Sequence, residues 1–125
     1  MHRVLDTFVS FYLAQGRVHI PPGALYGIDC PRYVRFLLAK DGKSMIMEPY
    51  DHKEFQSMRV PKCMYESNPT RRQMEIRCML FCRLLASWLK LDMGKSYRFP
   101  GKILCNQQLV VFDLTDVASV HNEIL

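Results

Sequence analysis

The chain lacks the features that mark several large classes of protein. No apolar run approaches the ~20 residues that span a membrane, and residues 1–14, with Arg3 and Asp6 among them, do not resemble a secretory signal. We therefore expect a cytoplasmic protein with no membrane contact. No phosphate loop, nucleophile elbow, Rossmann glycine pattern, HExxH or EF-hand occurs, and the four histidines are scattered. An enzyme is the disfavoured interpretation, and no cofactor is expected.

Cysteine is present, but not at the spacing of a metal site. None of the five cysteines forms a CxxC pair, and Cys78 and Cys82 are four residues apart with no histidine nearby. Paired zinc ligands usually show a tighter spacing, so we expect structural thiols, no metal site and a reducing compartment.

Basic residues are concentrated in the middle of the chain and are missing from its end. The net charge is +5; residues 59–102 carry ten Lys or Arg against three Asp or Glu, whereas residues 103–125 carry none against three. A basic segment is typical of proteins that meet nucleic acid or another polyanion. A soluble protein that happens to be basic is the alternative on charge alone.

The strongest local pattern lies in residues 15–50. Asp41-Gly42 suits a type I′ turn, which needs positive φ at both central residues, and therefore predicts a hairpin. The predicted elements are a strand over 17–20, a turn or short helix over 21–28, and hairpin strands over 33–39 and 44–49.

This order of elements resembles the swapped-hairpin DNA-binding domains of the AbrB-like transition-state regulators. The matching sequences are Gly16-Arg17-Val18-His19-Ile20-Pro21, Gly27-Ile28, Tyr33 to Leu38, Asp41-Gly42 and Met45-Ile46-Met47-Glu48-Pro49. The resemblance implies a β-rich α+β fold, a swapped-hairpin β-barrel, and a prokaryotic transcription regulator that binds duplex DNA. The chain departs from the family in its short helix, because the residues from Pro22 to Tyr26 include none of the basic residues that help the family to bind DNA.

The same order of elements is predicted a second time, over residues 73–114. Residues 73–77 alternate like a strand, residues 79–91 have helical spacing, and residues 96–104 and 109–114 form a second hairpin. The helix is expected to bury a stripe made of Leu80, Leu84, Leu85, Trp88 and Leu89.

An internal repeat changes the expected architecture. An isolated hairpin is marginal in water, so the two units are expected to interleave in one domain over 1–125, as a pseudo-dimer or through a homodimer. This arrangement is similar to that of the MraZ-like proteins. Their helix signature, an Asp and an Arg separated by three residues, is absent from both predicted helices, so their DNA-contact residues are not carried over.

The remaining segments connect and cover the two units. Residues 1–15 have apolar spacings that favour a helix closed by Gly16, although their aromatic and β-branched run leaves a strand open. Residues 51–72 are interpreted as a linker with a short strand over 57–60. Residues 115–125 predict a C-terminal helix capped by Thr115 or Asp116, and Asp113 is expected to end the preceding strand.

Arginines are the candidate site residues, because their forked donors suit phosphates and guanine edges. The candidates for DNA binding are Arg17, Arg32, Arg35, Arg71, Arg72 and Arg77. Arg32 and Arg35 are three apart and would point to opposite faces of a strand, so only one of them is expected to contribute. If the halves pair about a pseudo-two-fold axis, Arg17 would join the later arginines on one basic surface. Solvated surface arginines are the alternative.

A second hypothesis keeps the fold and changes the partner. In it the chain is a protein-interaction module, antitoxin-like or accessory, which binds a protein and no DNA. The missing basic residues of the first helix favour this hypothesis, and several of the eight methionines would suit an adaptable contact surface.

Overall fold

Antiparallel β-sheet dominates the structure, a computed structural model that describes residues 4–52, 57–65, 74–116 and 118–120. The strands are β1 (Val4–Tyr12), β2 (Arg17–Ile20), β3 (Tyr33–Leu38), β4 (Ser44–Tyr50), β5 (Ser57–Arg59), β6 (Met74–Arg77), β7 (Ser96–Leu104), β8 (Leu109–Asp113) and β9 (Ala118–Val120). The helices are α1 (Pro22–Gly27) and α2 (Met79–Leu89), and the 3-10 turns are η1 (Leu13–Gln15), η2 (Lys62–Tyr65) and η3 (Cys105–Gln107).

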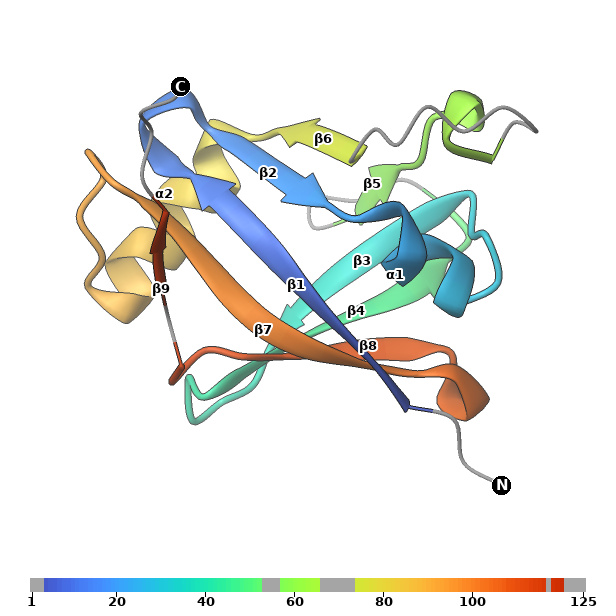
Figure 1. The fold of residues 1–125 in the computed structure, drawn as a ribbon. Helices are drawn as coiled ribbons and strands as arrows, with labels where there is room; N and C mark the ends of the chain where they lie inside the picture. Colours follow the sequence, from blue (N-terminus) through green and yellow to red (C-terminus); the bar gives the residue numbers. More distant parts are fainter. Residues whose placement is uncertain (1–3, 53–56, 66–73, 117, 121–125) are drawn as a thin grey trace.

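The strands form one sheet that curls into a nearly closed, barrel-like shape (Figure 1). Their order is β5-β3-β4-β8-β7-β1-β2-β6, and β9 pairs with β7 beside that path. Helix α2 packs near η1 and β2, whereas α1 packs near β1 and β7. The predicted β-rich α+β barrel-like fold is confirmed at this level.

The two halves of the chain repeat one order of elements and pair through equivalent strands. Strand, helix and hairpin follow one another twice, as β2-α1-β3-β4 and β6-α2-β7-β8. The equivalent strands β2 and β6 pair with each other, as do β4 and β8. Arg35 and Arg98 also take equivalent positions, because each faces a buried serine on the neighbouring strand, Ser57 of β5 or Ser10 of β1.

The core is filled from both halves of the chain. Aromatic rings join three strands to α2: Phe11 lies 5.7 Å from Phe99 and 6.1 Å from Phe81, and Phe36 lies 5.5 Å from Phe81, measured between ring centres. All four side chains are buried. Because inward and outward side chains alternate along a strand, this core leaves the other face of each strand for charged groups.

The first hairpin is confirmed, but its turn is not the predicted type I′. Only Gly42 has positive φ, at 71°, while Asp41 does not. The Ala39 amide donates to the Ser44 carbonyl, and the Gly42 amide donates to the Ala39 carbonyl. The loop is therefore four residues long, and the Asp41 carboxylate accepts from the Lys43 amide at 2.9 Å. Longer hairpin loops of this kind are usually built around a turn in which only one residue needs positive φ.

Both predicted terminal helices are wrong where the structure describes them. Residues 4–12 form β1, which pairs with all nine residues of β7. The long pairing with β7 favours the strand over the predicted helix. The aromatic and β-branched residues of this segment also suit a half-buried sheet. Gly16 does take a left-handed φ of 64°, but it ends η1. At the other end β9 replaces the helix over 118–120, and residues 121–125 lie outside the described part. Asp113 ends β8 as predicted, with Thr115 donating to its carboxylate.

The stripe predicted to be buried on α2 is largely exposed. Leu80, Leu84 and Trp88 are 56%, 43% and 48% exposed. The inward face instead carries Phe81, Cys82, Leu85 and Ala86. Of these four residues only Leu85 belongs to the predicted stripe. The helix has two apolar faces, and its packing beside η1 and β2 buries the one that carries Phe81 and Leu85.

Cys82 is the described cysteine that fits the expectation of a structural thiol. It is buried, and burial raises the pKa of its thiol to about 11. Cys30, Cys78 and Cys105 are half-buried. Among the described residues, neither helix has the length and apolar composition needed to cross a membrane.

Candidate nucleic-acid interface

Two of the predicted arginines meet where the halves of the chain pair. Arg17 of β2 lies directly opposite Arg77 of β6 in the antiparallel register. Both strands turn their alternate residues inward, Val18 and Ile76 among them, so the two arginines point to the outside of the barrel. Directly opposed residues have Cβ atoms about 5 Å apart, so this pairing joins two cations that are sixty positions apart in the sequence.

Glu75 lies between these cations and binds them. Its carboxylate accepts from Nε of Arg77 at 3.0 Å and lies 3.8 Å from Nη1 of Arg17. Nε2 of His19, which is directly opposite Glu75, lies 3.1 Å from the same carboxylate. Like charges opposite each other destabilise a sheet, and the carboxylate offsets that repulsion.

The environment of Glu75 favours its charged form. The hydrogen bond from Arg77 is the largest cause that lowers the pKa of the Glu75 carboxyl, with further contributions from the His19 hydrogen bond and the charges of Arg17 and Arg77. Slight burial acts in the opposite direction. The carboxylate therefore stays ionised to lower pH than an isolated glutamate.

A fourth basic residue joins the same face from a third strand, β7. Arg98 of β7, Ser10 of β1, His19 and Glu75 form one row across four neighbouring strands. Nε of Arg98 donates to Oγ of Ser10 at 3.1 Å, and the guanidinium carbon lies 4.2 Å from the ring centre of Phe8. Strands are about 4.8 Å apart, so Arg98 lies roughly 10 Å from His19 across the row.

We call this surface the basic face and define it as Arg17, His19, Glu75, Arg77 and Arg98. The arginines outnumber the single carboxylate, and the face is bordered by the aromatic rings of Tyr12 and Phe8. The Tyr12 ring lies 4.7 Å from that of His19. Cations interleaved with aromatic rings on an open sheet surface suit the phosphates and sugars of a nucleic acid.

Sequence reasoning did not identify Arg98, although the sequence carried a signal for it. Arg-Phe occurs at 35–36 in β3 and again at 98–99 in β7. Once the halves are taken as equivalent, the second copy marks Arg98 as the counterpart of Arg35. The pairing of β7 with β1 was not predicted, and without it Arg98 could not be placed on the same outer face as Arg17 and Arg77.

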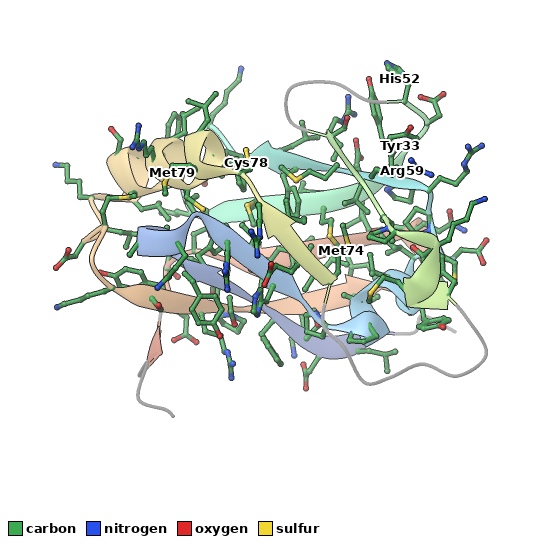
Figure 2. All side chains as sticks on the ribbon, turned by 90° about the horizontal axis from the view of Figure 1, so that it is seen from above. Tyr33, His52, Arg59, Met74, Cys78 and Met79 are labelled. Carbon is green, nitrogen blue, oxygen red and sulfur yellow. The ribbon has the colours of Figure 1, made fainter. Side chains whose placement is uncertain are left out.

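The other predicted arginines lie elsewhere. Arg35 of β3 pairs with Glu48 of β4, with Nε donating at 3.1 Å, and stacks over the Tyr50 ring at 4.3 Å. Arg32 precedes β3 and is exposed. Figure 2 shows Tyr33 and Arg59 of this region near His52, at a distance from Cys78 and Met79 where β6 meets α2. Arg71 and Arg72 lie outside the described residues.

An open groove of about 550 Å³ lies on the outer side of β1, β7, β8 and β4. Its charged lining is Asp6, Lys43, Lys102, Asp113 and Asp116. Lys102 pairs with Asp6. The other charged residues of the lining are Lys43, Asp113 and Asp116, so the net charge of the groove is negative. This groove does not extend the basic face.

Comparison with protein-family models, with curated proteins and with solved structures finds no match to this chain.

Proposed function

We propose that this chain is a DNA-binding transcription regulator of the AbrB-like type, in which two swapped-hairpin units are joined in one cytoplasmic, prokaryotic protein. The observation that carries the proposal is the pairing of β2 with β6, which sets Arg17 and Arg77 side by side on an outward face. Arg98 adds a third guanidinium to that face. Three arginines from three separate strands would contact the backbone of a duplex.

The interleaving of the two halves supports the swapped-hairpin interpretation. Each half contributes strands that pair with the other half, as in β1 with β7, β2 with β6 and β4 with β8. Such pairing gives each marginal hairpin additional strands and a shared core.

The chemistry of the basic face favours electrostatic binding with modest sequence preference. Arg17 and Arg77 are 41% and 70% exposed at their side chains, so their donors are accessible to phosphate oxygens. Guanidinium groups at phosphates fix position, while sequence preference would come from a few base contacts and from DNA shape. Affinity is then expected to fall steeply with salt, because each neutralised phosphate releases counterions.

The test is fluorescence-anisotropy binding of the full chain to a random-sequence duplex at about 50 and about 200 mM salt. We expect salt-sensitive binding, and a loss of at least about tenfold in affinity in the double variant Arg17→Gln and Arg77→Gln. Lys43→Gln is the matched control for loss of charge. Lys43 directly precedes β4, where β4 pairs with β8. This pairing lies on the opposite side of the barrel from the pairing of β2 with β6.

No binding at low salt would remove the DNA proposal. An equal loss of affinity per charge in Lys43→Gln and in the arginine variants would show that net charge alone, and no particular face, attracts the duplex. Light scattering on the same sample would report the oligomeric state.

The exposed side of α2 favours a second candidate, the protein-interaction module. Leu80, Leu84 and Trp88 follow one another at intervals of four and form a continuous apolar ridge in water. Exposed apolar ridges often mark contacts with other proteins. This candidate predicts no salt-sensitive DNA binding, together with a protein that copurifies with the wild-type chain and is lost in Leu84→Glu.

A further inference from the structure

The carboxylate of Glu75 lies among three of the basic groups of the basic face. It lies within 3.0 to 3.8 Å of three basic groups, those of Arg17, His19 and Arg77. Two of these groups come from β2 and one from β6, and all three converge on the same two oxygens from different directions. In effect, one carboxylate is held by two guanidinium groups and one imidazole.

A phosphate group presents the same chemistry as this carboxylate. Both are oxyanions that accept charge-assisted hydrogen bonds from guanidinium forks and imidazole. We propose that Arg17, His19 and Arg77 form a subsite for a phosphate oxyanion, and that Glu75 is its resident counter-ion, which an arriving phosphate displaces. The inference rests on the proposed function for the source of that phosphate, the backbone of duplex DNA.

The position of Glu75 allows it to leave. It lies on β6, an edge strand of the described sheet, and its side chain is 34% exposed. Exposed ion pairs are individually weak, and the glutamate side chain can rotate into water without disturbing Met74 or Ile76 on the inner face. Displacement therefore requires rotation of a side chain and no change in the sheet.

Displacement also has an energetic consequence that can be measured. In the wild-type chain a phosphate must break the contacts of Glu75 and then bind beside a carboxylate. In Glu75→Gln the repulsion is gone and the arginines are free to turn towards the ligand. We expect duplex DNA to bind Glu75→Gln about three- to tenfold more tightly than wild type.

Glu48→Gln is the matched control. Glu48 also lies on the outer side of a strand and pairs with an arginine, Arg35, but away from the basic face. Both variants add the same net charge, so a general attraction to DNA would raise their affinities equally. Glu75→Thr, which suits an exposed strand position, provides a second variant, and circular dichroism checks that each protein is folded.

The experiment has two arms, anisotropy with the random-sequence duplex and nuclear magnetic resonance of the arginine Nε–H and histidine ring signals during titration with inorganic phosphate at constant ionic strength. Tighter DNA binding by Glu75→Gln and Glu75→Thr, with Glu48→Gln like wild type, supports the subsite. If wild type binds DNA and neither Glu75 variant gains affinity beyond Glu48→Gln, the subsite is overturned while the proposed function stands.

The phosphate arm separates the two ideas when DNA does not bind. Phosphate-dependent shifts at Arg17, His19 and Arg77 in Glu75→Gln would support the subsite. Only duplex DNA would then be rejected as the source of the phosphate. The absence of both DNA binding and phosphate shifts would overturn the subsite together with the proposed function.

Discussion

Arg35 and Arg98 occupy equivalent places in the two halves of the chain but have different electrostatic surroundings. Each is followed by a buried phenylalanine, each faces a buried serine and each stacks on an aromatic ring. Arg35 is held by the carboxylate of Glu48. Among the residues that the structure describes, no carboxylate pairs with Arg98, whose Nε binds a serine hydroxyl.

The difference comes from the strand on the far side of each arginine. β4 runs beside the whole of β3 and places Glu48 opposite Arg35. Its equivalent, β8, ends at Asp113, and β9 takes over beside β7 with Ala118 opposite Arg98. A repeated local sequence thus gives the same backbone position, while the neighbouring strand β4 supplies the carboxylate that pairs with Arg35.

The largest expected effect tests whether the halves are equivalent in the core. Phe99→Ala and Phe36→Ala should each lower the free energy of unfolding by about 3–5 kcal/mol, because both remove a buried ring and leave a cavity. Urea denaturation with a common slope would measure both. A loss below about 1 kcal/mol in one variant alone would show that Phe36 and Phe99 do not have equivalent roles in the core.

An intermediate effect tests the electrostatic difference between the two arginines. Arg98→Gln should weaken binding to the duplex about three- to tenfold, since it removes a cation of the basic face. Arg35→Gln should change DNA affinity less than about twofold and lower the free energy of unfolding by at most about 1 kcal/mol, because it breaks a surface pair. Anisotropy would measure the DNA affinity of both variants, and urea denaturation would measure their stability. Equal losses of affinity would place Arg35 in the interface as well.

The smallest effect concerns Glu75 and pH. Its pKa is lowered in the folded chain, so its ion pairs add stability above the unfolded pKa of about 4.3, and that stability is lost as pH falls through the lowered value. The difference in unfolding free energy between wild type and Glu75→Gln should be a few tenths of a kcal/mol near pH 6, since exposed pairs are screened. It should shrink towards about pH 3, as urea titrations at both pH values would show. A difference that grows on acidification would contradict the assignment.

Local signals predicted much of the fold, and their failures have physical causes. Alternation and turn residues located both hairpins, β2, β6 and α2, because these patterns depend on near neighbours. Residues 4–12 satisfied helix and strand patterns at once, and only the long pairing with β7 decided between them. On α2, Trp88 and Leu85 are both apolar, and the packing of the helix against the barrel buries Leu85 and leaves Trp88 exposed.

The candidate interface was predicted in part. The hypothesis that Arg17 joins a later arginine agrees with the register that sets Arg77 opposite it. Arg98 was missed, and Arg35 is placed in a separate ion pair.

The sequence by itself determined both hairpins, β2, β6 and α2, and which side chains on each of these strands share a face, because these patterns repeat every two to four residues. Only the tertiary structure decided which strands are neighbours. That choice set Arg17 against Arg77 and placed the carboxylate of Glu75 within reach of both arginines. Strand pairing joins segments that are distant in the chain, so its outcome depends on how the whole core packs and not on any local pattern.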